Sequence, residues 1–260
     1  MDDFHPIVLG TFASSLATIG TALGAGAVFF IRRLEPRVED MLLSSAAGIM
    51  LAATFFSLLM PGMERGSEQF GSESIAALVV IGGLLAGAVL LWLIHRFAPH
   101  EHFIKGPEGP RDPRLGRIWL FVIAITLHNF PEGMAVGVGA AAGGFSGSAA
   151  LTLGIGLQNI PEGLAVAVSL LAVGYSRAHA FWIGLLSGLV MPLGGLLGSA
   201  AVWLAEPLLP AILGFAAGAM LFIISDEIIP ETHRRGFETA ATFSLIGGFA
   251  VMMLIEATIG

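Results

Sequence analysis

The sequence predicts an all-α integral membrane protein with eight transmembrane helices. Of its 260 residues, 55% are hydrophobic and only 12% are charged, and the mean hydropathy is +0.86. Apolar runs of about 20 residues recur along the chain, which is the length that a helix needs to cross a hydrocarbon core about 30 Å thick. These observations exclude an ordinary soluble domain.

The eight expected spans follow from the apolar runs and from the polar or helix-breaking segments between them. They cover residues 7–31, 41–61, 75–95, 116–141, 148–172, 179–204, 209–230 and 240–258. We expect a single transmembrane domain over residues 1–260, with a loop at about 96–115. The 35 glycines favour this interpretation, because small residues let helix backbones approach closely in lipid.

The distribution of cations predicts the orientation of the chain. Of the 12 Lys and Arg residues, 11 fall in the loops after the first, third, fifth and seventh spans or within two residues of them, and only Arg65 falls on the other side. By the positive-inside rule those four loops are cytoplasmic, so both termini lie outside. The expected location is the bacterial inner membrane, as a multi-pass protein.

Two short similarities predict an internal repeat. Residues 46–51 in the second span resemble residues 216–221 in the seventh, and residues 80–83 resemble residues 245–248 in the eighth. The offset is five helices, and because five is odd the two repeats must be inverted in the membrane. We therefore expect a 3+2+3 arrangement, in which the fourth and fifth spans lie between two inverted three-helix repeats.

The fourth and fifth spans carry a matched polar motif. His128-Asn129-Phe130-Pro131-Glu132-Gly133 corresponds to Gln158-Asn159-Ile160-Pro161-Glu162-Gly163. His128 and Glu132 are four residues apart, as are Gln158 and Glu162, so each pair shares one face of its helix. Two such faces, if they oppose each other, make a cage of four ligands.

The charge of this cage points to a cation. Ionised Glu132 and Glu162 would each cost about 2.5–3.5 kcal/mol at the centre of a membrane helix, and no Lys or Arg lies in the interior of any expected span. Protons or a bound cation must supply the compensating charge. The neighbouring nitrogen and oxygen donors suit a divalent transition metal. Met50, in the second span, could add a thioether ligand, although packing alone would also explain one of 10 methionines.

These motifs, the eight spans, the external termini and a cytoplasmic loop with histidines resemble the ZIP (Zrt/Irt-like) family of divalent metal transporters, in its prokaryotic branch. The resemblance implies import of zinc, and often of cadmium, iron or manganese, toward the cytoplasm. It implies a mid-membrane metal site of Met50, His128, Glu132, Gln158 and Glu162. It also implies an elevator-like motion of spans 1, 4, 5 and 6 against spans 2, 3, 7 and 8.

The sequence departs from the two-metal version of that family at two positions. Asn159 stands where an Asp is expected, and Met191, beside Pro192, stands where a Glu is expected. The remaining pair of carboxylates has a formal charge that matches one divalent ion. We therefore predict one principal metal, and a weak or empty second site involving Asn129, Asn159 and Met191.

Further polar groups lie near the cytoplasmic side. The end of the seventh span holds Asp226, Glu227, Glu231 and His233, which could receive the ion as it leaves, although a solvated helix end paired with arginines explains them nearly as well. His95, His100 and His102 in the loop region could bind metal weakly, but an ordinary flexible loop is the simpler interpretation.

Other functions receive less support. The net charge of -7 and the lack of a basic stripe argue against nucleic acid as a partner. An intramembrane metal-dependent hydrolase would need an arrangement such as His-Glu-x-x-His, which is absent, so no enzyme is predicted. A metal-selective channel stays open as an alternative. We expect no cofactor beyond the transported ion, the lipid bilayer as surroundings, and a homodimer by analogy with the family.

Overall fold

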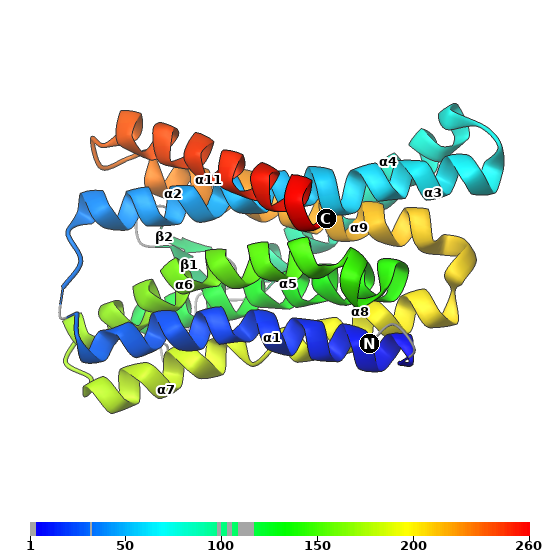
Figure 1. Ribbon diagram of the computed structural model, residues 1–260. Helices are drawn as coiled ribbons and strands as arrows, with labels where there is room; N and C mark the ends of the chain where they lie inside the picture. Colours follow the sequence, from blue (N-terminus) through cyan, green and yellow to red (C-terminus); the bar gives the residue numbers. More distant parts are fainter. Residues whose placement is uncertain (1–3, 32, 98–99, 103–105, 109–116) are drawn as a thin grey trace.

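The computed structural model describes residues 4–31, 33–97, 100–102, 106–108 and 117–260, and almost all of them are helical. The long helices lie side by side and run roughly parallel or antiparallel (Figure 1). The helices are α1 (Pro6–Gly26), α2 (Pro36–Ala53), α3 (Met60–Phe70), α4 (Glu73–Phe97), α5 (Arg117–Gly147), α6 (Ala149–Ala172), α7 (Arg177–Gly188), α8 (Met191–Leu204), α9 (Leu209–Ile223), α10 (Ile229–Thr232) and α11 (Glu238–Ile259). The other elements are η1 (Ala27–Phe29), η2 (Thr54–Leu59), η3 (Glu206–Leu208), η4 (Ile224–Ile228) and the antiparallel strands β1 (His100–His102) and β2 (Gly106–Glu108).

The described helices overlap the expected spans, but the structure differs from the expectation in three places. The second helix runs without a break from Pro36 to Phe70, well past residue 61, because polar residues end a hydrophobic run without ending a helix. The sixth span is divided at residues 189–190. Pro192 is the second residue of α8, in the first turn, where its missing N–H removes no hydrogen bond within the helix. The expected 96–115 loop contains the β1–β2 pair, which lies against α5.

Length and composition agree with a membrane protein. Among the described residues, seven helical segments are long and apolar enough to cross a bilayer. The remaining long helix is α5, with 31 residues and a break at Gly144, where φ is 72°. It carries one of the two polar motifs. The chain is therefore an all-helical, multi-pass membrane protein apart from its short strand pair.

The helices form two bundles, which Figure 1 shows as an upper and a lower layer. The first, which we call the α5–α6 bundle, contains α1, α5, α6, α7 and α8. The second, which we call the α2–α11 bundle, contains α2, α3, α4, α9 and α11. The most extensive contacts, such as those between α4 and α9 or between α1 and α6, fall inside a bundle, whereas α2 and α6 make the largest contact between bundles.

Glycines hold the helices of each bundle together at backbone distance. A Cβ atom added at Gly48 of α2 would overlap the carbonyl oxygen of Leu245 in α11, and one at Gly24 of α1 would overlap that of Ile160 in α6. Among the described glycines, each one whose added Cβ would overlap the backbone of another helix does so inside its own bundle. Close backbone approach therefore locks each bundle internally.

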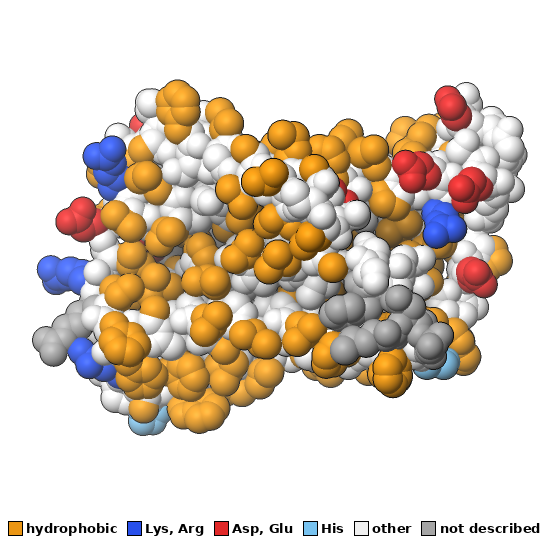
Figure 2. Space-filling model, in the orientation of Figure 1, with side chains coloured by type: hydrophobic (Ala, Val, Ile, Leu, Met, Phe, Trp, Pro, Cys, Tyr) orange, Lys and Arg blue, Asp and Glu red, His pale blue; other side chains and the backbone are white. Residues whose placement is uncertain are grey.

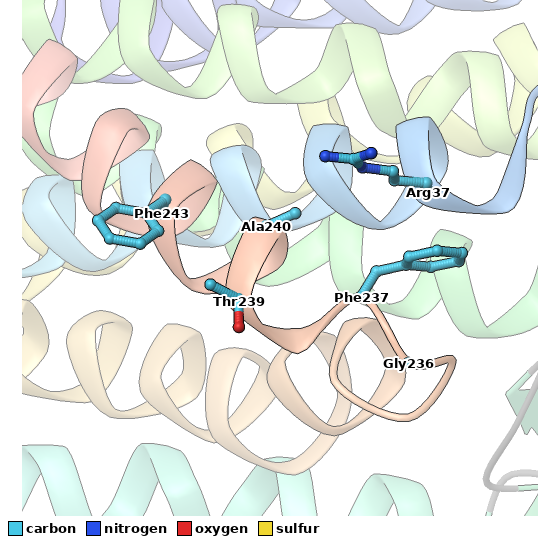
Figure 3. Close-up of a pocket in the computed structure, with 6 residues that line it drawn as sticks. All are labelled: Arg37, Gly236, Phe237, Thr239, Ala240 and Phe243. Atoms are coloured by element: carbon cyan, nitrogen blue, oxygen red, sulfur yellow. The ribbon is translucent and has the colours of Figure 1, made fainter.

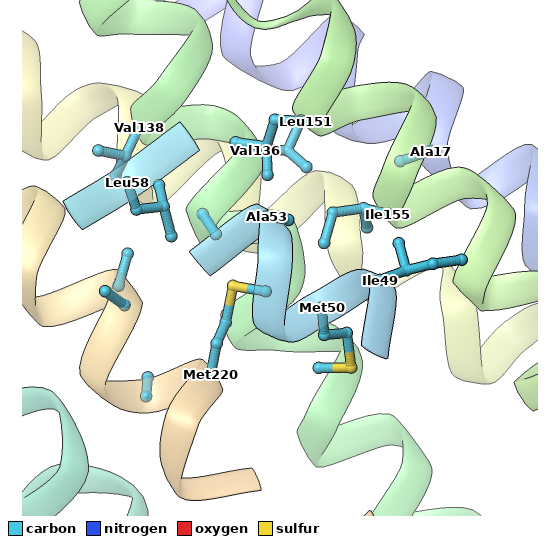
Figure 4. Packing of buried hydrophobic residues seen from close by; sticks show 14 of the residues in the cluster. Ala17, Ile49, Met50, Ala53, Leu58, Val136, Val138, Leu151, Ile155 and Met220 are labelled. Atoms are coloured by element: carbon cyan, nitrogen blue, oxygen red, sulfur yellow. The ribbon is translucent and has the colours of Figure 1, made fainter. Parts of the chain in front are cut away.

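Apolar side chains pack between the two bundles. Figure 4 shows Met50, Ala53 and Met220 of the α2–α11 bundle packed near Val136 and Ile155 of the α5–α6 bundle, in one buried cluster. Among the described glycines, Gly154 of α6 makes the tightest contact between the bundles, because a Cβ atom added there would overlap the sulfur of Met252 in α11. This part of the contact between the bundles is therefore apolar, and at no described glycine do the backbones of the two bundles interlock.

Helices α2 and α9, which carry the repeated residues 46–51 and 216–221, share a local feature. Helices α2 and α9 run in opposite directions (Figure 1), and each passes into a π-helical segment, which begins at Thr54 in one and at Ile224 in the other. These residues have the same offset as the repeated residues 46–51 and 216–221. Pro61 follows the first π-helical segment and Pro230 follows the second. Each π-helical segment therefore lies where a proline, which has no N–H, removes a backbone hydrogen bond from the helix.

Charges divide between the two ends of the molecule. Figure 2 shows Lys and Arg gathered at the end where α1 joins α2 and α10 joins α11, and mostly acidic groups at the other end. This agrees with the cation asymmetry of the sequence. Hydrophobic side chains cover the surface between the two ends, as expected of a surface that faces lipid.

Candidate metal centre

Helices α5 and α6 place both polar motifs in the interior. Glu132 and Gln158 are fully buried, and His128 and Glu162 are 5% and 4% exposed. Gly133 lets α5 approach the backbone of Met191 in α8, and Gly163 lets α6 approach that of Thr21 in α1, so both motif helices are fixed against their neighbours immediately after the Glu. The structure brings Glu132 within electrostatic reach of Glu162 and beside Gln158.

Most side-chain oxygens of the two motifs lack a well-formed hydrogen bond. Five buried oxygens accept no hydrogen bond of ordinary geometry from the described residues. They are both carboxylate oxygens of Glu132, Oε2 of Glu162, Oε1 of Gln158 and Oδ1 of Asn129. A buried acceptor without a donor is costly, and a carboxylate without a counter-charge is more so. An oxygen-rich, anionic site of this kind is chemically suited to a divalent cation.

The amide groups behave differently from the carboxylates. Gln158 Nε2 donates to Asn159 Oδ1 at 2.6 Å, and Asn159 Nδ2 donates to the sulfur of Met191 at 3.0 Å. Asn129 Nδ2 donates to the carbonyl oxygen of Ser187 at 3.1 Å. The two residues that replace the expected acids, Asn159 and Met191, are thus hydrogen-bonded to each other.

Met50 belongs to the other bundle. It is fully buried on α2, within the apolar cluster that joins the bundles (Figure 4). The other four residues expected to bind metal lie on α5 and α6. Any bond between Met50 and an ion held by Glu132 and Glu162 would therefore cross from one bundle to the other.

A second buried cluster joins the motif to the end of α4. Glu227, in the π-helix η4, lies with Oε1 2.9 Å from Nε2 of His95 and with Oε2 2.5 Å from Nε2 of His128. Among the described residues, these three form a group whose donor atoms are close enough together to hold one metal ion. Glu162 also lies within electrostatic reach of Glu227, so the cluster continues the central site.

This cluster changes the interpretation of two sequence-predicted groups. His95 lies in the last turn of α4 and is 4% exposed, so it is not part of a flexible loop with His100 and His102. Those two residues lie in β1, and their side chains fall outside the described part of the structure. In the sequence, only the position of His95 at the end of an apolar run suggested that it could be buried. Its contact with Glu227 could not be predicted, because no spacing rule connects residue 95 with residue 227.

The predicted group at the end of the seventh span is divided. Asp226 approaches His95 at 4.0 Å, so it lies beside the cluster. His233 turns away from it, with Nε2 3.1 Å from the hydroxyl of Thr242 in α11. Glu231 lies one turn beyond Glu227 and interacts electrostatically with Arg235. Only Glu227 and Asp226 are therefore brought to the central motif.

Known proteins resemble this chain over most of its length. The profile of the ZIP zinc transporter family matches residues 110–256. A protein named zinc transporter ZIPB from Bordetella bronchiseptica is 46% identical over 97% of this chain and 81% of its own length. Zinc transporter GufA from Myxococcus xanthus is 43% identical over 96% and 99%, and human zinc transporter ZIP11 is 35% identical over 98% and 99%. Because the family profile and these relatives match the part of the chain that carries the buried motifs, the resemblance seen in the sequence is confirmed, and the chain belongs to the ZIP family of zinc transporters, which move metal ions across a membrane and are not enzymes.

Proposed function

We propose that this protein carries zinc across the bacterial inner membrane toward the cytoplasm, through a site formed by His128, Glu132, Gln158 and Glu162. The observation that carries the proposal is the set of five buried oxygens on α5 and α6 that accept no hydrogen bond of ordinary geometry from the described residues. Carboxylate and amide oxygens with one imidazole match the donors that zinc accepts. The names of the relatives support zinc as the ion.

The two-bundle architecture supports alternating access. Glycine contacts lock each bundle internally, whereas packed apolar side chains and the contact of His128 with Glu227 join the two bundles. Moving one bundle past the other breaks no interlocked backbone contact, so an elevator-like motion of the α5–α6 bundle is the change that the packing opposes least. Met50 would stay with the α2–α11 bundle, and its bond to the ion would break during the motion.

A second group of possible metal ligands, Glu227 and His95, lies next to the central site. Glu227 and His95 belong to the α2–α11 bundle, whereas His128 belongs to the α5–α6 bundle. We propose that His128 is shared, so that the ion passes from the Glu132 and Glu162 carboxylates to Glu227 and His95 on its way to the cytoplasm. The cation-rich end of the molecule faces the cytoplasm in this proposal, and both termini lie outside.

We expect the central site to bind one metal ion. Asn159 and Met191 satisfy each other by a hydrogen bond and carry no charge, so they do not add to the charge of Glu132 and Glu162. A second divalent ion would lack the anions needed to neutralise it.

Metal uptake into proteoliposomes tests this function. A zinc-sensitive dye inside vesicles reports uptake for the native protein, for Glu132→Ala and for Glu162→Ala, with Glu64→Ala as a control because Glu64 is exposed on α3. We expect saturable zinc uptake that both site variants abolish and that the control retains. Parallel assays with cadmium, iron and manganese rank the other ions.

Two results would contradict the proposal. Uptake that survives both substitutions would place the transport site elsewhere. Uptake that rises linearly with zinc concentration and carries an ohmic current would replace the carrier with a channel.

A further inference from the structure

A pocket opens at the cation-rich end of the α2–α11 bundle, away from the metal motif. Its volume is about 410 Å³, within the range of small-ligand sites. The lining residues are Arg37, Gly236, Phe237, Thr239, Ala240 and Phe243 (Figure 3). Arg37 comes from the first turn of α2, and the others come from the turn before α11 and from its first turns. The pocket therefore lies between the ends of two helices that cross the membrane.

Arg37 gives this pocket its charge. Its side chain is exposed, and the described residues provide it with no ion pair. Arg235, on the turn that precedes α11, is in contrast already engaged, because its Nη1 donates to Glu39 at 2.7 Å and lies 3.4 Å from Asp40. The acids nearest in sequence to Arg37 on α2 are thus paired with Arg235, which leaves Arg37 as the positive charge lining the pocket.

The remaining walls are mostly apolar and continue into an exposed apolar surface. Phe243 is 71% exposed on α11, a helix whose outer surface carries further exposed apolar residues such as Ile246 and Leu254. Gly236, with φ of 88°, reverses the chain without a side chain, and no atom lies near the position of its absent Cβ. Arg37 could contact the anionic headgroup of a phospholipid, and the exposed apolar surface of α11 could contact its acyl chains.

We propose that this pocket binds an anionic phospholipid, with its phosphate on Arg37 and its acyl chains along the exposed surface of α11. A basic pocket between transmembrane helices on the cytoplasmic side is a recognised way to hold an anionic headgroup. Free phosphate shares the charge but not the chains, and it would gain nothing from Phe243. The lipid would bridge α2 and α11, two helices of the same bundle.

Native mass spectrometry of the full chain tests the proposal by counting bound lipids during titration with phosphatidylglycerol or phosphatidylcholine. We expect tighter binding of phosphatidylglycerol, weakened about fivefold by Arg37→Ala, which is the effect of roughly one cation at a membrane surface. Arg37→Lys should keep the affinity within about twofold because the charge remains. Arg33→Ala is the matched control, because Arg33 is exposed at the same end of the molecule but does not line the pocket.

Ala240→Phe separates a pocket from diffuse attraction, because it fills the space and leaves the charge unchanged. We expect this variant to lose the preference for phosphatidylglycerol as well, and we expect millimolar inorganic phosphate not to compete. Equal losses in Arg33→Ala and Arg37→Ala would overturn the proposal, as would full binding by Ala240→Phe or complete displacement by phosphate. Glu132→Ala should bind lipid like the native protein, so the outcome is independent of metal transport.

Discussion

His128 Nε2 lies 2.5 Å from Glu227 Oε2, and this contact joins the motif helix α5 to the π-helical segment of the opposite bundle. Because His95 approaches the other oxygen of the same carboxylate, one Glu links an imidazole from each bundle. If the two bundles moved past each other, His128 would move relative to Glu227 and His95. A change in the position of α5 would therefore change which carboxylates lie within reach of the His128 side chain.

The first prediction concerns this link. Glu227→Gln should lower the rate of zinc uptake roughly tenfold, the effect typical of a group that supports a metal ligand. Binding at the central carboxylates should change less, because Glu132 and Glu162 remain. Stopped-flow dye measurements on proteoliposomes report the rate, and equilibrium dialysis reports the binding. Glu231→Gln, one turn away, is the control, and an equal loss of rate in both variants would remove the special role of Glu227.

The second prediction concerns metal stoichiometry. The native protein should bind one zinc tightly, whereas the double variant Asn159→Asp, Met191→Glu should bind two, because it restores two anions beside the shared carboxylates. Elemental analysis of dialysed protein counts the ions. Met191→Gln is the uncharged control and should keep one. Two tightly bound ions in the native protein would contradict the argument from charge.

The third prediction concerns Met50. Its loss should weaken cadmium binding roughly tenfold, equivalent to about 1.4 kcal/mol, and should affect manganese far less, because thioether sulfur is a soft ligand. Isothermal titration of Met50→Ala with both ions measures the difference. Met220→Ala is the matched control, since Met220 is equally buried on α9 and is not expected to bind metal. If the two variants lose cadmium affinity alike, the role of Met50 is packing.

The fourth prediction concerns the glycine contacts. Gly48→Ala should destabilise the protein by about 1–3 kcal/mol, because the new methyl group would overlap the backbone of α11 at Leu245. Gly247→Ala meets open space and should be neutral or should stabilise the helix by up to about 1 kcal/mol. Thermal unfolding in detergent, followed by tryptophan fluorescence, compares the two. A similar change in both midpoints would show that Gly48 is not a packing contact.

Much of the fold could be predicted from the length and position of the apolar runs in the sequence. A helix that crosses lipid must bury its own backbone hydrogen bonds and present apolar side chains, so length and hydropathy locate it. The same reasoning could not find the end of the second helix at Phe70, because nothing in hydropathy marks a helix that continues into water. Nor could it find the division between α7 and α8, which depends on the local geometry around Pro192.

The candidate site divides in the same way. The sequence by itself determined the pairing of His128 with Glu132 and of Gln158 with Glu162, because a spacing of four residues fixes a shared helix face. Only the tertiary structure decided that His95 and Glu227 join this group. Those residues lie on α4 and in η4, and their proximity depends on how two helices pack, which neither periodicity nor charge counting specifies. Local spacing is encoded within one helix, whereas contacts between helices depend on the packing of the whole bundle.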